Sequence, residues 1–163
     1  MTAEPRIVQR AEQPYVAIKA LVTMQELGQV LPGLHPGIYQ WLGSHGGHPA
    51  GPPFWKYNVI DMERQLEVEV GVPVPTAMSG DDQVLAGVLP AGRYATLVHT
   101  GHPAGLEDAT RMLLGWAAQQ GLAWDVEETG GDERWAARLE IYQEQPPPDM
   151  DTWETELAFK LAG

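Results

Sequence analysis

Hydrophobic and polar positions alternate along several segments of the chain and recur with helical spacing along others. Residues 15–23, YVAIKALVT, are β-branched and half alternating, which predicts a strand. Residues 24–47 have helical spacing interrupted by two prolines, so we expect a short helical turn and then a helix from Pro36 to about Gly43. The following stretch, PFWKYNVIDMERQLEVEVGVPV, alternates in two runs joined around residues 61–65 and predicts a β-hairpin.

The same order of elements then begins again. Residues 92–101, GRYATLVHTG, predict a strand. Residues 106–121 predict the clearest helix, with acids in the first turn and a glycine at its end. The apolar stripe of this helix is Leu106, Ala109, Leu113, Trp116 and Ala117. Residues 134–161 predict two more strands, with QPPPD as the turn between them.

The chain is therefore predicted to be an α+β domain made of two β-α-β-β units. We expect one domain over residues 1–163, with a first half at about 14–75 and a second at about 84–162. Such a unit cannot cover both faces of its sheet, so pseudo-twofold packing of antiparallel sheets around a central ligand groove is expected. The pentapeptide GHPAG also occurs twice, at 47–51 and 101–105, but at non-equivalent places in this repeat.

Composition narrows the classes of function. The formal net charge is −12, with 10 Lys and Arg against 22 Asp and Glu, which disfavours direct binding of nucleic acid. The absence of cysteine removes thiolate chemistry and cysteine-bound zinc. The N-terminus has no apolar signal core and no segment is long enough to span a membrane, so a cytoplasmic location is expected. The histidines, glycines and serines match no zinc helix, P-loop or nucleophile elbow, so we expect neither a metal nor a cofactor.

Aromatic rings and glutamates are the candidate binding groups. Six Trp and five Tyr are many amphipathic rings for this length, and such rings stack flat ligands and attract cations, although packing in the core is the alternative for each of them. In ARLEIYQ, Glu140 lies on the strand face that carries Arg138 and Tyr142, opposite the apolar residues. Glu67 and Glu69 share a face of the hairpin in the same way. A solvated strand face is the alternative for these glutamates.

Several motifs of the chain resemble the GyrI-like family, the effector-binding domain of AraC- and MerR-type multidrug regulators, which also occurs as standalone bacterial proteins. In the first half the resemblance rests on GPPFWKYNVIDMERQLEVEVGVPV, and in the second on HTG, LLGWAAQQGL, LEIYQEQP and TWETEL. The chain departs from the family pattern in having QEQP where an aspartate-proline is usual, and it has no helix-turn-helix.

The resemblance implies an aromatic groove that carries an acidic residue. The glutamate of the family's E-x-Y strand falls on Glu140, that of its E-x-G-x-P-V strand on Glu69, and its hairpin tyrosine on Tyr57. Strand alternation places Tyr57 with Val59 and away from Glu69, so these two predictions conflict. The rings predicted to line the groove are Phe54, Tyr57, Tyr94, Trp124, Trp135, Tyr142 and Trp153.

Two classes of function remain open from the sequence. The first is a binding module for bulky hydrophobic, aromatic or cationic compounds, with Glu140 as the counter-charge. The second, implied by the resemblance, is a hydrolase that opens cyclopropane-bearing genotoxic compounds, with Glu140 as general acid or base and Glu69 or a tyrosine as its partner. A protein partner, gyrase, is the further alternative that the resemblance implies.

Overall fold

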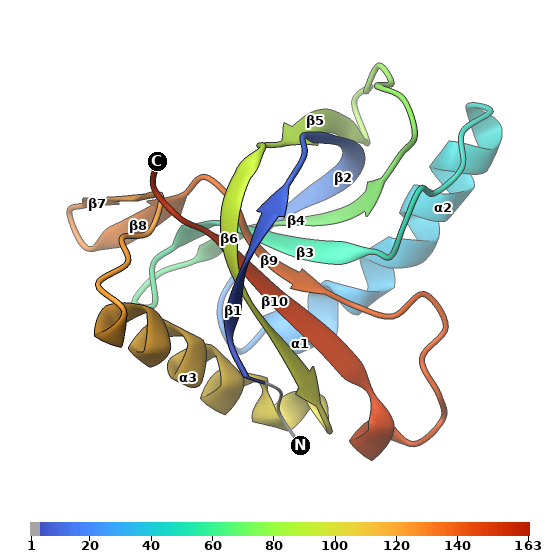
Figure 1. The fold of residues 1–163 in the computed structure, drawn as a ribbon. Coiled ribbons are helices and arrows are strands. Elements are labelled where there is room, and N and C mark those ends of the chain that lie inside the picture. The colour runs from blue at the N-terminus through green and yellow to red at the C-terminus, as the bar shows by residue number, and fades with distance from the viewer. Residues whose placement is uncertain (1–3) are drawn as a thin grey trace.

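The computed structural model describes residues 4–163 as an antiparallel sheet, curled on itself, with two longer helices packed against it (Figure 1). The strands of this part of the chain are β1 Arg6–Arg10, β2 Gln13–Val22, β3 Phe54–Ile60, β4 Leu66–Pro73, β5 Leu85–Leu89, β6 Gly92–Thr100, β7 Val126–Thr129, β8 Asp132–Trp135, β9 Arg138–Ile141 and β10 Glu154–Lys160. The helices are α1 Leu27–Val30, α2 His35–Ser44 and α3 Leu106–Gln119, and the 3-10 turns are η1 Pro32–Leu34, η2 Pro103–Gly105 and η3 Met150–Thr152.

The order of the strands confirms the α+β fold and its duplication. Along the sheet the order is β1-β6-β10-β9-β3-β4-β2-β5, which reads as two equivalent sets of four that meet between β9 and β3. Each set contains the predicted unit, β2-α2-β3-β4 or β6-α3-β9-β10. The halves do not keep separate sheets, because β3 pairs with β9 through Trp55 and Glu140.

The outermost strands exchange between the halves. β1 precedes β2 in the chain but pairs with β6, while β5 precedes β6 but pairs with β2. Each half therefore supplies an edge strand to the other. The pattern did not predict these two strands, because RIVQR and LAGVL are short and lack clear alternation of apolar with polar residues.

The small hairpin of β7 and β8 was also not predicted from the sequence. Its strands, VEET and DERW, are mostly polar and therefore lack an apolar face. The turn carries a clear signal nonetheless, because Gly130 and Gly131 both have positive φ, at 60° and 96°. A pair of glycines between two short runs is a strong signal for a tight hairpin.

The elements that were predicted are confirmed within a few residues at their ends. The first strand, the interrupted helical segment, the hairpin, the second strand and the long helix all form as expected. On α3 the residues of the predicted stripe are buried except Trp116, which is half-buried. The two GHPAG segments differ, as predicted: the first follows α2 in a loop, whereas the second follows β6 and forms η2.

Buried side chains form three clusters, two of them under the helices. One cluster lies between α2 and strands β2 and β4, and includes Ile38, Leu42 and Val70. A second lies between α3 and strands β6 and β10, and includes Leu113 and Phe159. The third is formed by Tyr15, Ala17, Phe54, Tyr94, Ala137, Leu139 and Ala158. This third cluster contains residues of both halves, so it joins them into one core.

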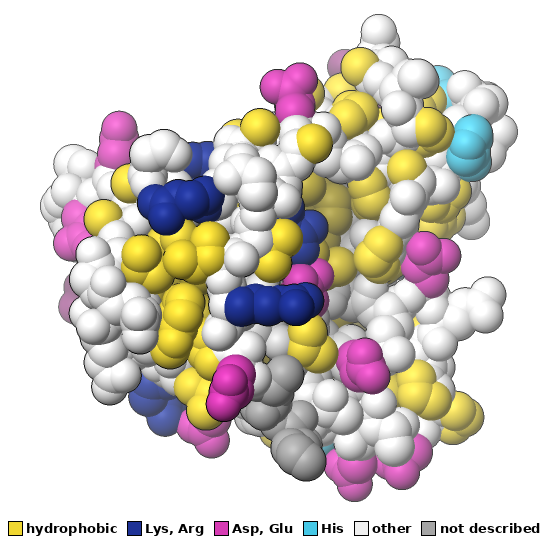
Figure 2. All heavy atoms as spheres, viewed as in Figure 1, with side chains coloured by type: hydrophobic (Ala, Val, Ile, Leu, Met, Phe, Trp, Pro, Cys, Tyr) yellow, Lys and Arg dark blue, Asp and Glu magenta, His cyan; other side chains and the backbone are white. Residues whose placement is uncertain are grey.

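The surface carries no broad basic patch on the face seen in Figure 2. Basic side chains lie in a few separate places on this face, and acidic side chains are scattered over it, mostly toward its edge (Figure 2). No helix within residues 4–163 is long and apolar enough to cross a membrane.

Candidate functional site

A large pocket opens between the two helical regions of the molecule, over strands β3 and β9. We call it the central pocket; its volume is about 960 Å³. Its walls come from the segment of α1 and α2, from the start of α3, and from the loop that follows β9. The apolar and aromatic lining residues are Met24, Leu27, Pro32, Tyr39, Pro53, Trp55, Tyr57, Ile60, Met62, Leu66, Pro103, Ala104, Leu106, Tyr142, Pro146, Met150, Trp153 and Phe159.

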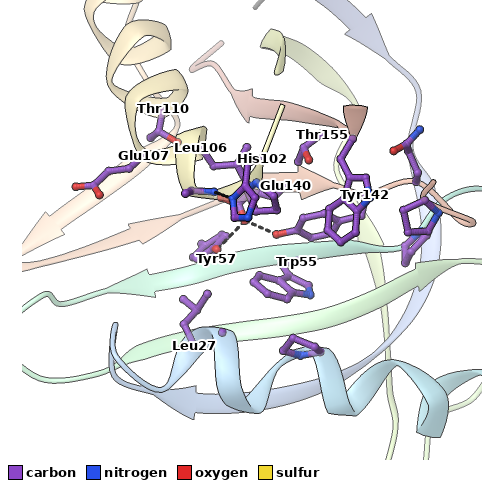
Figure 3. A pocket seen from close by; sticks show the side chains of 18 of the residues that line it. Leu27, Trp55, Tyr57, His102, Leu106, Glu107, Thr110, Glu140, Tyr142 and Thr155 are labelled. Carbon is purple, nitrogen blue, oxygen red and sulfur yellow. Dashed lines mark hydrogen bonds between the residues drawn. The ribbon is translucent and has the colours of Figure 1, made fainter. Parts of the chain in front are cut away.

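Strand alternation places the key side chains on the floor of the central pocket. Trp55 and Tyr57 point into it from β3, and Glu140 and Tyr142 point into it from β9 and the residue that follows (Figure 3). Arg138 of β9 also lines the pocket. Side chains two residues apart on a strand share a face. Because β3 and β9 are paired, with Trp55 opposite Glu140, the two sets of side chains form one surface.

A β-bulge in β3 adjusts which residues face the central pocket. Tyr57 pairs with Val68, but the next pair is Val59 with Glu67, so Asn58 is the extra residue. Regular alternation after Tyr57 would point Ile60 away from the pocket, yet Ile60 lines it. The bulge therefore extends the apolar floor beyond Tyr57.

Glu140 lies at the centre of this floor between two phenols (Figure 3). Tyr57 Oη donates to Glu140 Oε1 at 2.9 Å, and Tyr142 Oη donates to the same oxygen at 2.5 Å. Among residues 4–163, no other side chain or backbone group donates a hydrogen bond to this carboxylate. In this part of the chain Oε2 therefore has no hydrogen-bond donor.

Burial sets the protonation of this group. Loss of water around the carboxylate raises the pKa of Glu140, and the hydrogen bonds from Tyr142 and Tyr57, with the charge of Arg138, offset only part of that rise. Burial and the neighbouring carboxylate also raise the pKa of both phenols well above the usual range. Both tyrosines therefore keep their protons and remain donors.

The Trp55 ring beside Glu140 is held in place by a hydrogen bond to helix α2. Trp55 Nε1 donates to His35 Nε2 at 2.9 Å, which ties β3 to the first residue of α2. Burial lowers the pKa of His35, which favours the neutral ring that this bond requires. Trp55 also meets Tyr142 edge to face, with ring centroids 5.0 Å apart.

The charges around the central pocket are mostly negative. Glu107, Glu144 and Glu154 lie at its edge in addition to Glu140 on its floor, and Arg138 is the one Lys or Arg among the described lining residues. In residues 4–163, no three His, Asp or Glu side chains are grouped so that they could hold a metal ion.

The same architecture defines a known family of ligand-binding domains. A model of the GyrI-like small molecule binding domain matches residues 3–162, nearly the whole chain. The chain belongs to the GyrI-like family. No functionally curated protein matches the sequence significantly.

Solved structures of low sequence identity share the GyrI-like fold. The C-terminal domain of EcmrR matches with a TM-score of 0.74 and 16% identity, over 98% of this chain and 97% of that one. In a cryo-EM structure of EcmrR with DNA, the TM-score is 0.75 at 17% identity over 97% of this chain, which spans only 57% of the EcmrR chain.

Two further structures of this fold are a protein with a bound ligand and a hydrolase. SAV2435, bound to tetraphenylphosphonium, gives a TM-score of 0.60 at 14% identity, over 99% of this chain and 95% of that one. A hydrolase from Listeria innocua gives 0.64 at 12% identity, over 98% and 92%. At these identities the likeness shows the fold alone.

Of the residues singled out in the sequence of this GyrI-like domain, four line the central pocket. They are Tyr57, Glu140, Tyr142 and Trp153. Trp153 is held in place by its indole, whose Nε1 donates to the Pro147 carbonyl at 2.6 Å.

Glu69 lies on the opposite face of the sheet, away from the central pocket. Its side chain is 7% exposed. Tyr15 Oη donates to Glu69 Oε1 at 2.6 Å, and Asn58 Nδ2 and Lys56 Nζ approach Oε2, the lysine at 3.6 Å. The conflict between Tyr57 and Glu69 is thus decided by the sheet, which separates the two side chains.

The other four rings belong to the cores. Phe54 and Tyr94 are buried in the third cluster, and the Tyr94 hydroxyl donates to the Pro90 carbonyl at 2.7 Å. Trp124 and Trp135 pack with Phe159 under α3, with ring centroids 5.6–5.8 Å apart. Phe54, Tyr94 and Trp135 are buried, and Trp124 is half-buried against the second cluster.

Trp55 and His35 also line the central pocket, and neither was predicted from the sequence to do so. Alternation alone could have found Trp55, because it lies two residues before Tyr57 on the same strand. Nothing local marks His35, because its role depends on a contact with a residue 20 positions away.

Proposed function

We propose that this GyrI-like domain is a receptor for bulky hydrophobic cations, which it binds in the central pocket with Glu140 as the counter-charge. The observation that carries the proposal is the Glu140 carboxylate, which lies on an apolar, aromatic floor. Its Oε1 accepts from two phenols, and its Oε2 has no hydrogen-bond donor within residues 4–163. An ionised carboxylate in such surroundings is costly until an opposite charge arrives.

The size and lining of the pocket support a large, weakly hydrated ligand. A volume of about 960 Å³ is at the upper end of the range for drug-sized molecules. Trp55, Tyr57 and Tyr142 offer ring faces and edges around the carboxylate, and aromatic rings attract cations that have lost water. SAV2435, which shares the fold, was solved with tetraphenylphosphonium, a ligand of this kind.

The test compares two ligands of nearly the same shape, methyltriphenylphosphonium and neutral triphenylphosphine oxide, by isothermal titration calorimetry. Glu140→Gln keeps a carbonyl that can accept from both phenols but removes the charge. We expect the cation to lose about 2–5 kcal/mol of binding free energy in this variant, while the neutral ligand changes little. Equal losses for both ligands, or no binding of the cation by the wild type, would refute the proposal.

The raised pKa of Glu140 also favours the second candidate, hydrolysis, because a carboxylic acid that keeps its proton to higher pH than usual is better suited to act as a general acid. Glu69 does not reach the central pocket, so Tyr57 and Tyr142 would have to assist. Incubation with cyclopropane-bearing alkylators separates the classes: product formation by the wild type that is lost in Glu140→Gln would favour an enzyme, and stoichiometric binding without product a receptor. The gyrase interaction stays a prediction.

A further inference from the structure

Arg138 is the feature of the central pocket that a receptor for simple cations does not explain. It lies on β9 two residues before Glu140, lines the same cavity, and its side chain is 15% exposed. The guanidinium lies over the rings of Phe159 and Trp135, at 4.5 Å and 4.8 Å from their centroids. A positive charge is thus fixed beside the proposed cation site.

The charge of Arg138 is only weakly matched by the protein. Its nearest acid is Glu133, with 3.9 Å between Nη1 and Oε1, which is beyond hydrogen-bond distance. That oxygen already accepts from Trp135 Nε1 at 3.1 Å, and the Glu133 side chain is 41% exposed to water. Among residues 4–163, no group accepts a hydrogen bond from the guanidinium, although it has five donors to offer.

The spacing of Arg138 and Glu140 selects among ligands. Residues two apart on one strand lie roughly 6.6 Å apart along it. A ligand with only a cationic group pairs with Glu140 but is repelled by the guanidinium. A ligand that also carries an anionic oxygen at about this distance converts that repulsion into a charge-assisted hydrogen bond.

We propose that the central pocket prefers zwitterionic aromatic ligands, in which the cationic group meets Glu140 and a carboxylate or similar oxygen anion meets Arg138. The inference rests on the proposed function, because it assumes that Glu140 binds the cationic group. Burial lowers the pKa of Arg138, in agreement with a guanidinium that gains from a partner in the pocket.

The experiment uses rhodamine 6G, an ethyl ester with a net positive charge, and rhodamine 19, its free acid, which is zwitterionic at neutral pH. The two dyes share one ring system, and fluorescence anisotropy reports the binding of each. We expect the wild type to bind rhodamine 19 about tenfold more tightly than rhodamine 6G. In Arg138→Met this preference should be lost, because the repulsion of the ester and the attraction of the acid are both removed.

Matched variants separate this effect from damage to the fold. Arg134→Met removes the same charge from β8, outside the central pocket, and should leave the order of the dyes unchanged. Arg138→Lys keeps the charge and should retain part of the preference for the acid. The wild-type preference tests the inference even if Arg138→Met fails to fold.

The two proposals fail in different ways. If methyltriphenylphosphonium or rhodamine 6G binds the wild type while rhodamine 19 binds more weakly, or if Arg138→Met changes both dyes equally, the zwitterion preference is wrong and the cation site stands. If no cation binds, both proposals fall.

Discussion

At the scale of single residues, burial of the Glu140 carboxylate lowers the stability of the fold, and the same burial bears on the binding of a ligand. Water is largely excluded from its carboxylate, and the two phenols and Arg138 do not fully compensate. In the proposed function, this incomplete compensation favours pairing of the carboxylate with an incoming cation. The protonation of Glu140 bears on both the stability of the fold and the affinity for a cation.

The first concerns stability without ligand. The unfolded chain loses the Glu140 proton at the ordinary pKa, whereas the folded chain keeps it to higher pH because burial raises the pKa. The folded state therefore binds more protons between the two values, and wild-type stability falls as pH rises through that window. Glu140→Gln should raise Tm by about 2–4 °C at pH 8 and have no effect at pH 4. Thermal denaturation checks this; a difference that does not grow with pH would contradict it.

The second concerns the phenol that bonds most closely to the carboxylate. The hydrogen bond from Tyr142 lowers the pKa of Glu140, so Tyr142→Phe should raise that pKa further and leave less carboxylate ionised. We expect cation affinity at neutral pH to fall about tenfold and the midpoint of its pH profile to move upward. Tyr94→Phe is the control, since its hydroxyl bonds to Pro90 outside the pocket. Equal effects of the two variants would count against the proposed role of Tyr142.

At the scale of elements, the paired strands β3 and β9 face the central pocket on one side and the third cluster on the other. Trp55 and Glu140 face the pocket, while their neighbours Phe54 and Leu139 are buried in the cluster. Strand alternation made this arrangement predictable for Glu140 and Tyr142. It could not locate the bulge at Asn58, because a bulge depends on how β3 pairs with β4.

The buried side of the sheet is tightly packed where β3 meets β4. A Cβ added at Gly71 would lie 2.6 Å from Phe54 Cζ, so Gly71→Ala should displace the ring and cost about 1–3 kcal/mol of unfolding free energy. Gly115→Ala is the matched control, because a Cβ there has open space on α3 and should stabilise the helix by up to about 1 kcal/mol. Urea denaturation measures both; a neutral Gly71→Ala would show that the ring has room to move.

At the scale of the whole molecule, exchanged strands, strand pairing and a shared core join the two halves. Strands β1 and β5 cross over, β3 pairs with β9, and the third cluster draws Tyr15 and Phe54 from one half and Tyr94 and Leu139 from the other. We therefore infer that the two halves form one cooperative domain.

This inference can be tested with fragments. Residues 1–79 and 80–163, produced separately, should each lack dispersed NMR signals and a cooperative thermal transition, because each leaves half of the third cluster exposed. Mixing them should restore both. A fragment that unfolds cooperatively by itself would show that the halves are independent.

The sequence by itself determined the elements with strong periodicity and the face of the strand on which Glu140 lies. These features depend on residues within a few positions of one another, so the local pattern contains them. Only the tertiary structure decided the exchange of β1 and β5 and the contact of His35 with Trp55. It also decided that Tyr94, Trp124 and Trp135 pack in clusters away from the pocket. A tyrosine or tryptophan on a strand has the same local pattern whether its face meets a core or a cavity. Whether the ring meets a core or a cavity depends on which part of that face the helices cover.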